Sequence, residues 1–284
     1  MSAVIRDVSD TALWAAVYRA RENERERPVF RDPLARKLAG TRGDEIAAQI
    51  PFSEKNAWSW IARTYLFDRF IEARVREGTD TVLNLGAGLD TRPYRAALPP
   101  SLRWIEVDLP GLLEYKKERL ADEKPACHLE RIALDVADVT ARRALFRRIG
   151  DQGRRVLVVT EGLMIYLTAA QAVELAEDLA VPQSFQDWVL DLANPGLMRM
   201  LQKNIASQLR TGGAALQFAP AEGAAFFEPH GWQPTDVQGL MKTAARLHRA
   251  PLLMRLLSLL PEPRVISPSR PWAGVCLLTR RPLH

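Results

Sequence analysis

Short apolar runs alternate with helical patterns along residues 79–200, and this alternation predicts an open α/β sheet. The runs lie at residues 81–85, 102–108, 128–136, 155–160 and 187–193, and a last one lies at 272–279. Residues 231–239 are expected to lead into a sixth strand. Apolar runs of this length between helical segments are typical of parallel strands that are covered on both faces. We therefore expect a mostly parallel sheet with helices on both faces.

The first 78 residues show helical periodicity instead. One helix is predicted over 12–23, a short one over 34–39, and a longer, aromatic-rich one from Ser53 to near Gly78. Because these helices precede the first strand and its glycine turn, we expect them to lie over the ligand-binding edge of the sheet.

We interpret the whole chain as one domain, 1–284. Its parts are a helical N-terminal cap at 1–78 and a cofactor-binding α/β core at 79–284. Insertions on the substrate side are expected at about 197–230 and 240–270. No internal repeat or low-complexity linker divides the chain.

The strand at 81–85 runs into a glycine turn and then a capped helix. Gly86 and Gly88 allow the backbone to approach a ligand closely. The third glycine of a dinucleotide fingerprint is absent, and Asp90 stands where a pyrophosphate would lie at the helix N-terminus. A cofactor without phosphate and with a cationic centre, such as S-adenosylmethionine, fits this turn better, although a plain tight turn is the alternative.

Three acids end successive strands. Asp108, at the tip of the second strand, can accept hydrogen bonds from ribose hydroxyls, and its alternative role is a helix cap. Asp135 can accept from an adenine amino group, while the N–H of Val136 serves a ring nitrogen. Glu161 follows the fourth strand. Together these acids outline a ligand that is rich in donors and carries positive charge.

Arg63 lies in the aromatic-rich helix that leads into the first strand. A partly buried arginine requires a carboxylate, and the amino-acid end of S-adenosylmethionine offers one. A salt bridge to a protein carboxylate explains the pattern equally well.

Composition limits the remaining classes. The 284 residues are 47% hydrophobic and 26% charged with a net charge of +5, and the basic residues are mostly interleaved with acids, which favours a solvated basic face over a nucleic-acid surface. Cys127 and Cys276 have no metal-ligand partners, so we expect no metal site, and two free thiols are typical of a reducing cytoplasm. The N-terminus has no signal core, and the apolar segment 251–260 is too short to span a membrane.

Several motifs together resemble the leucine carboxyl methyltransferase-like family, which includes bacterial O-methyltransferases of polyketide tailoring. They are SDTALWAA near the start, RDPLA at 31–35, ART at 62–64, LGAGLDTRPYR at 85–95, EVDLP at 106–110, LDV at 134–136, EGLMIYLT at 161–168 and FFEPHGW at 226–232. The resemblance implies the class I methyltransferase fold, a Rossmann-like, seven-stranded, mostly parallel sheet with a reversed final hairpin. It also implies S-adenosyl-L-methionine as cofactor, with S-adenosyl-L-homocysteine as product.

The resemblance further assigns residues to the cofactor. It implies that Arg63 binds the methionine carboxylate and that Glu161 lies near its amino or sulfonium end. The other cofactor positions that it implies are Gly86, Ala87 and Gly88 at the methionine moiety, Asp108 with Leu109 at the ribose, and Asp135 and Val136 at the adenine. A further basic residue in the first helix is expected to contact the cofactor or the acceptor, and Arg19 and Arg21 are alternatives for it.

We expect the acceptor to be a carboxylate of a small molecule or peptide-like natural product, and the alternative is a phenol of a polyketide-type acceptor. A carboxylate is already ionised at neutral pH and needs no base, whereas a phenol does. Candidate catalytic residues are Glu161, Tyr166 and His230, and candidate substrate contacts are Tyr18, Arg19, Arg21, Tyr166, Phe226 and Trp232. Alternatives of another class are a nicotinamide-dependent oxidoreductase and a non-catalytic cofactor-binding protein. We expect neither a nucleic acid nor a membrane as partner.

Overall fold

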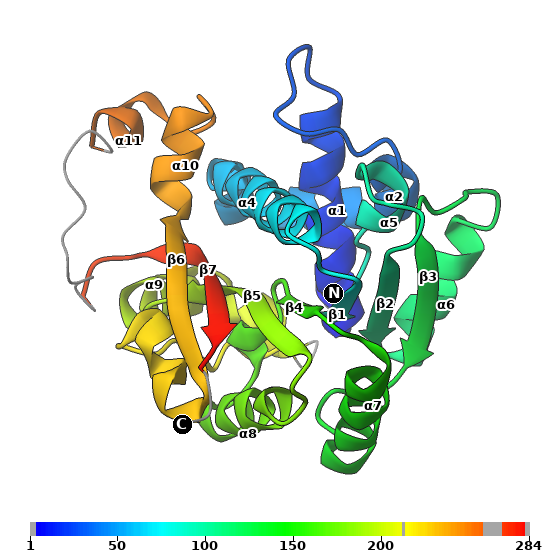
Figure 1. Ribbon diagram of the computed structural model, residues 1–284. Helices are drawn as coiled ribbons and strands as arrows, with labels where there is room; N and C mark the ends of the chain where they lie inside the picture. Colours follow the sequence, from blue (N-terminus) through cyan, green and yellow to red (C-terminus); the bar gives the residue numbers. More distant parts are fainter. Residues whose placement is uncertain (1–3, 212–213, 258–268, 282–284) are drawn as a thin grey trace.

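The computed structural model describes residues 4–211, 214–257 and 269–281, and its centre is a seven-stranded sheet (Figure 1). The strand order is β3-β2-β1-β4-β5-β7-β6. The strands are β1 Thr81–Leu85, β2 Arg103–Asp108, β3 His128–Ala133, β4 Val156–Thr160, β5 Phe185–Ala193, β6 Trp232–Gly239 and β7 Ala273–Arg280. β7 runs antiparallel to both β5 and β6, while β1 to β5 pair in parallel. The expected mostly parallel sheet with a reversed final strand is therefore confirmed.

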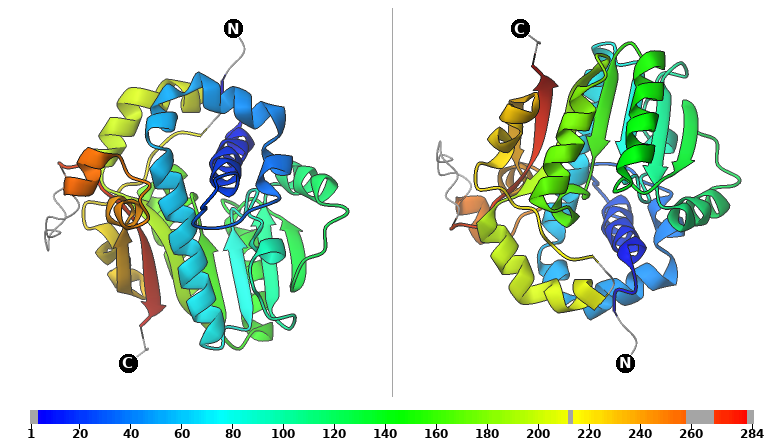
Figure 2. Two further views of the ribbon diagram at one scale, coloured as in Figure 1. Left: turned by 90° about the horizontal axis from the view of Figure 1, so that it is seen from above. Right: turned by 90° about the horizontal axis from the view of Figure 1, so that it is seen from below.

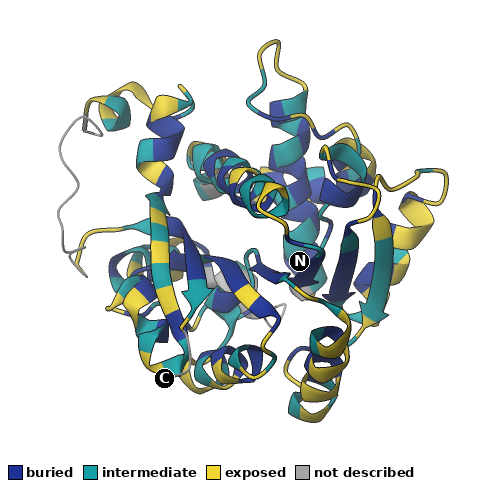
Figure 3. Ribbon diagram, viewed as in Figure 1, coloured by how far each residue is buried: buried dark blue, intermediate teal, exposed yellow. Residues whose placement is uncertain are grey.

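Helices cover both faces of this sheet. On one face, α4 (Ala57–Arg76) and α10 (Leu240–Arg246) pack against apolar side chains such as Val82 and Leu157. On the other face, α7 (Val139–Gln152), α8 (Ala169–Ala180) and η2 (Gly223–His230) pack against β1, β4 and β5. Every residue of β1 is buried, as Figure 3 shows by its colour, which explains the nearly continuous apolar pattern of that strand.

A third apolar cluster lies beyond one end of the sheet. Side chains of α1 (Val8–Asn23) and α2 (Ala35–Gln49) pack there with Leu89, with Leu112 of α6 (Pro110–Arg119) and with Ile205 of α9 (Pro195–Thr211). Figure 2 shows the blue cap helices and the yellow-green α9 gathered at the same end of the sheet. Segments far apart in the sequence thus close over the edge where the glycine turn lies.

Several helix boundaries differ from the sequence-based expectation. The first helix begins at Val8 and not at residue 12, because the side chain of Asp7 caps α1 by accepting from the N–H groups of Ser9 and Asp10. The predicted 34–39 helix is the first part of α2, which bends at Gly40 with φ 57°. The predicted helix from Ser53 is two helices, α3 (Pro51–Lys55) and α4, so position 53 lies within α3.

The C-terminal elements also refine the prediction. Residues 232–239 are themselves strand β6, and the helical region after them contains α10 and α11 (Leu252–Leu257), whereas 258–268 lie outside the described residues. The shorter elements are α5 (Arg92–Arg95) and the 3-10 turn η1 (Met164–Tyr166). The capping box that Thr168 makes with Gln171 begins α8. Among the described helices, none is both long and apolar enough to cross a membrane.

Candidate functional site

A cavity of about 1370 Å³ opens where the carboxyl ends of β1, β2, β4 and β5 face the N-terminal cap. Its polar wall includes Arg63, Asn84, Asp90, Arg92, Asp108, Asp135, Glu161 and Asp191. Its apolar wall includes Trp14, Phe52, Trp58, Trp60, Leu197, Met200, Leu201, Ile205, Leu216, Met241, Met254 and Trp272. Ligands of open α/β sheets bind at this edge, so the cavity is the candidate site.

The glycine turn forms part of the cavity floor. Gly86 and Gly88 have backbone φ values of +64° and +49°, which residues other than glycine rarely adopt. A Cβ at Gly86 would lie 3.2 Å from Leu163. The N–H of Gly86 donates to the carbonyl of Val107 at 2.9 Å, which holds the turn beside the end of β2.

Asp108 binds the same turn. Its Oδ2 accepts from the N–H of Gly88 at 2.6 Å, and its Oδ1 accepts from the N–H of Leu109 at 2.7 Å. Burial raises the pKa of Asp108, although these two N–H donors act in the opposite direction. Each carboxylate oxygen retains a further lone pair, so Asp108 can still accept from ligand hydroxyls. The Gly88 N–H, which a pyrophosphate would require, is already taken.

Asp135 and Val136 lie at the rim beyond β3. The exposed Asp135 accepts from the N–H of Ala137 at 2.9 Å, and Val136 is buried. Both line the cavity, as do Ala87 and Leu109. The nine residues expected to hold the cofactor thus all lie along one continuous wall.

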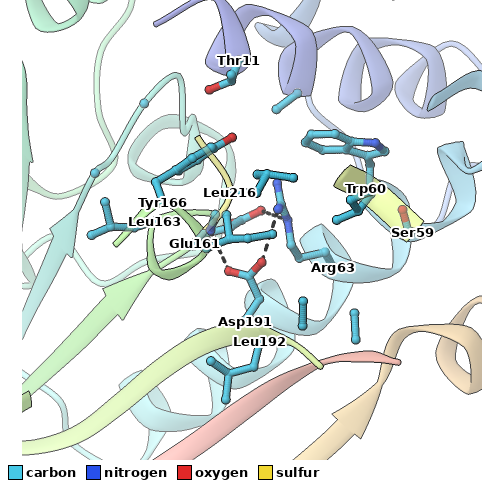
Figure 4. A pocket seen from close by; sticks show the side chains of 18 of the residues that line it. Thr11, Ser59, Trp60, Arg63, Glu161, Leu163, Tyr166, Asp191, Leu192 and Leu216 are labelled. Atoms are coloured by element: carbon cyan, nitrogen blue, oxygen red, sulfur yellow. Dashed lines mark hydrogen bonds and ion pairs between the residues drawn. The ribbon is translucent and has the colours of Figure 1, made fainter. Parts of the chain in front are cut away.

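Arg63, Glu161 and Asp191 form a charged cluster at the end of β4 and β5 (Figure 4). Arg63 Nε lies 3.2 Å from Glu161 Oε1, and its Nη1 lies 3.3 Å from Asp191 Oδ2. The guanidinium also lies over the Trp60 ring, with its carbon 4.8 Å from the ring centre. The protein carboxylates that were the alternative partners of Arg63 are its partners in the structure.

Asp191 is a fourth acid of this edge, and the sequence analysis did not single it out. It accepts from the N–H of Gly162 at 2.6 Å. Burial raises its pKa, and the nearby Arg63 lowers it in part. The acidic pattern at the ends of the preceding strands was the available signal. Asp191 stands two residues before the end of β5, so its position within the apolar run does not indicate a residue at the strand end.

Tyr166 of η1 also faces the cavity, near Thr11 of α1 (Figure 4). Burial raises the pKa of its phenol, which is hydrogen-bonded to Thr11. Tyr166 is therefore a neutral hydroxyl at pH 7 that can donate a hydrogen bond. Across the described parts of the chain, no group of three His, Cys, Asp or Glu side chains is arranged to hold a metal ion.

Comparison with known proteins identifies the family. The profile of the leucine carboxyl methyltransferase family matches residues 12–180. The chain belongs to this family. A Streptomyces coelicolor protein provisionally named as an S-adenosyl-L-methionine-dependent methyltransferase is 37% identical over 177 residues, which cover 58% of this chain and 61% of that relative. A Streptomyces avermitilis protein with the same provisional name is 30% identical over 84% of this chain and 87% of its own length.

Solved structures support the fold alone. A Streptomyces avermitilis protein described as a member of the DUF574 family has a TM-score of 0.61 at 13% identity, covering 94% of this chain and 97% of that chain. A Thermobifida fusca protein provisionally described as a methyltransferase has a TM-score of 0.59 at 18% identity, covering 98% and 96%. The class I methyltransferase fold is thereby shown for this member of the leucine carboxyl methyltransferase family.

Three residues expected near the substrate lie away from the cavity. The Trp232 side chain is fully buried between the sheet and α8, where its Nε1–H donates to the Ala176 carbonyl at 2.9 Å. Phe226 packs against the same core, and His230 pairs with Glu177 at 3.0 Å. The prediction that these side chains line the site is therefore wrong, because η2 and the first residue of β6 pack on a face of the sheet and not at its ligand-binding edge.

The two basic residues of α1 that were candidates for a ligand contact, Arg19 and Arg21, lie in different places. Arg19 lines the cavity, but it is held by Asp32 at 2.9 Å and by the Leu89 carbonyl at 2.6 Å. Arg21 forms an ion pair with Glu54 outside the cavity. Tyr18 is buried and stacks on Trp60 from behind the lining residues. Of the alternatives that this family suggested in the first helix, Arg19 is the one beside the site.

Proposed function

We propose that this methyltransferase transfers a methyl group from S-adenosyl-L-methionine to a carboxylate oxygen of a small molecule or peptide-like natural product. The observation that carries the proposal is the row of groups along the carboxyl edge of the sheet. It begins with acids that accept hydrogen bonds at Asp135 and Asp108 and ends in the mixed cluster of Arg63, Glu161 and Asp191.

These side chains would bind different parts of S-adenosyl-L-methionine. Arg63 would bind its carboxylate, while Glu161 and Asp191 would accept from its ammonium group. Asp108 would accept from the ribose hydroxyls, and Asp135 with the Val136 N–H would meet the adenine edge. When bound, the cofactor supplies a methyl group on a cationic sulfur.

A carboxylate acceptor agrees best with the lining of the cavity. A carboxylate is ionised at pH 7, so the protein needs only to align it and exclude water. Among the described residues, no histidine lines the cavity, and Tyr166 has a raised pKa and cannot act as a base near neutral pH. The apolar side chains of α1, α4 and α9 would hold the hydrophobic body of the acceptor. These walls also support an acceptor from secondary metabolism, as in the polyketide-tailoring branch.

Phenol methylation is the second candidate. The observation in its favour is Asp191, a cavity-lining carboxylate whose pKa is raised by burial and which could accept the phenol proton. Its contacts with Arg63 and the Gly162 N–H favour the ionised form that a base requires. A nicotinamide dinucleotide is disfavoured because the Gly88 N–H is bonded to Asp108.

The experiment uses S-adenosyl-L-methionine with a labelled methyl group and a panel of aromatic and aliphatic carboxylic acids and phenols. A methyl ester, the product from a carboxylic acid, releases labelled methanol in mild alkali. An aryl methyl ether, the product from a phenol, does not. We expect label transfer to carboxylic acids with alkali-labile product. Alkali-stable product would favour the phenol candidate. Binding of the cofactor without transfer to any acceptor would favour a non-catalytic role.

A further inference from the structure

Arg92, the first residue of α5, lies beneath the charged cluster of the cavity floor. Its side chain is 3% exposed and has three acidic partners. Nε donates to Asp68 Oδ1 at 2.6 Å, while Nη1 donates to Asp90 Oδ2 at 2.9 Å and to Glu161 Oε2 at 2.8 Å. The remaining nitrogen, Nη2, lies 3.4 Å from the Thr64 carbonyl. These contacts engage all three nitrogens and hold the guanidinium of Arg92 in one position.

Glu161 is held by two different arginines, one on each oxygen. Arg92 contacts Oε2, and Arg63 lies against Oε1 at 3.2 Å. The two arginines differ in their freedom. Arg63 is 17% exposed, has longer contacts of 3.2 and 3.3 Å, and stands beside the open space of the cavity. Arg92 also lines the cavity, but its side chain is only 3% exposed and is held by three carboxylates, so it is less free than Arg63 to turn toward a ligand.

This difference matters when the carboxylate of a ligand enters the site. If Arg63 turns toward a ligand carboxylate, Glu161 and Asp191 lose part of their compensating charge. Two partly buried carboxylates that share a weakened cation repel each other, and one of them would turn away. Arg92 remains on Oε2 and keeps the Glu161 carboxylate facing the cavity.

We propose that Arg92 is a positioning residue, which fixes Glu161 for the ammonium end of the cofactor and leaves Arg63 available for its carboxylate. The inference rests on the proposed function, because it assigns a task within the same site. Arg92 itself contacts neither reacting group. It acts through Glu161 and through Asp90, which it holds beside the glycine turn with a second bond from its own backbone N–H at 2.9 Å.

The test compares Arg92→Lys with Arg95→Lys by calorimetric titration. Lysine keeps the charge but has one nitrogen that cannot reach three carboxylates. Arg95 is the matched control, since it is buried on the same short helix and pairs with Asp68 at 2.7 Å but not with Glu161. Two ligands are used, S-adenosylhomocysteine and 5′-methylthioadenosine, which has the adenosine but lacks the amino-acid end.

We expect Arg92→Lys to weaken S-adenosylhomocysteine binding by about tenfold or more, as the loss of a charge-assisted contact does, and to leave methylthioadenosine binding unchanged. Arg95→Lys should change neither ligand by more than about twofold. An equal loss for both ligands, or no loss for either, would overturn the inference. If wild-type protein binds no S-adenosylhomocysteine, the proposed function itself fails, which is a separate outcome.

Asp68→Asn tests the same contact from the far side of the guanidinium if Arg92→Lys does not fold. Asparagine has nearly the same shape as aspartate but gives Arg92 a weaker partner at Nε. The expected result is a several-fold loss for S-adenosylhomocysteine alone. Unchanged affinity for both ligands in a folded Asp68→Asn protein would contradict the proposed role.

Discussion

The carboxyl ends of β1, β2, β4 and β5 form one wall of the cavity, and α1, α9, α10 and α11 form the opposite wall. The first wall is polar, and its side chains are positioned by contacts within a few residues of a strand end. The second is mostly apolar, and its helices come from both ends of the chain. A binding wall made from local turns is recognisable in sequence, whereas one made by packing distant helices is not.

The opposite wall contains a buried ion pair between Glu22 of α1 and Arg249, which lies in the segment that joins α10 to α11. Both Glu22 oxygens lie within 3.1 Å of the Arg249 guanidinium, and the Glu22 side chain is 0% exposed. Arg249→Ala would remove the main partner of this buried carboxylate and leave it with the half-exposed Arg25 at 3.1 Å and the Val29 N–H at 2.8 Å. We expect the free energy of unfolding to fall by about 3–5 kcal/mol, measured by urea denaturation.

The same variant should bind S-adenosylhomocysteine normally while folded, because the carboxyl-edge wall is untouched. The control is the double variant Glu22→Gln, Arg249→Met, which removes both charges and should recover part of the lost stability. If Arg249→Ala weakened ligand binding at low temperature, where it remains folded, the two walls would not be independent.

Removing the central acceptor of the polar wall should have the converse effect. Asp108→Ala deletes a carboxylate that can bond ligand hydroxyls, and each such charge-assisted bond contributes about 1.5–3 kcal/mol. We expect S-adenosylhomocysteine affinity to fall by about 2–3 kcal/mol in a calorimetric titration. Asp122→Ala, at an exposed acid after α6 that does not line the cavity, is the control and should bind as the wild type does. Equal affinity of both variants would remove Asp108 from the site.

A smaller effect is expected in the pH dependence of the free energy of unfolding. Burial opposes the ionisation of Asp90, but Arg92 and then Lys116 outweigh it and lower its pKa from 3.8 to about 2. A lowered folded-state pKa stabilises the fold above pH 3.8, and this stabilisation is lost as the pH falls through 2. We expect a contribution of about 2 kcal/mol at pH 5.

The measurement is the free energy of unfolding of wild type and Asp90→Asn between pH 5 and pH 2. The difference between the two proteins should shrink as the pH falls, because the wild-type carboxylate becomes protonated. A difference that stays constant over this range would show that the Arg92 contact adds no pH-dependent stability.

Much of the polar wall could be predicted from the sequence because its signals are local. The two glycines and the acids at the ends of β2 and β4 lie at fixed offsets from apolar strands, so their convergence follows from a parallel sheet. Asp191 could not be predicted as a site residue in this way, because it stands before the end of β5 and not after it. Whether Arg63 meets a ligand or a protein carboxylate also depends on neighbours 98 and 128 residues away.

The opposite wall could not be predicted in the same way. The aromatic side chains of residues 226–232 resemble a hydrophobic pocket, but Trp188 and Phe227 pack with Trp232 as an edge-to-face cluster within the core. Nothing in the local pattern distinguishes a core aromatic from a pocket aromatic. Only the packing of η2 against β5 and α8 decides the outcome.

The most direct measurement is a calorimetric titration of the wild-type protein with S-adenosylhomocysteine, followed by competition with NADH. We expect saturable binding at one site per chain and no displacement by NADH, because Asp108 already occupies the Gly88 N–H that a pyrophosphate needs. Absence of S-adenosylhomocysteine binding, or its displacement by NADH at equal concentration, would contradict the assignment of this edge to a sulfonium cofactor.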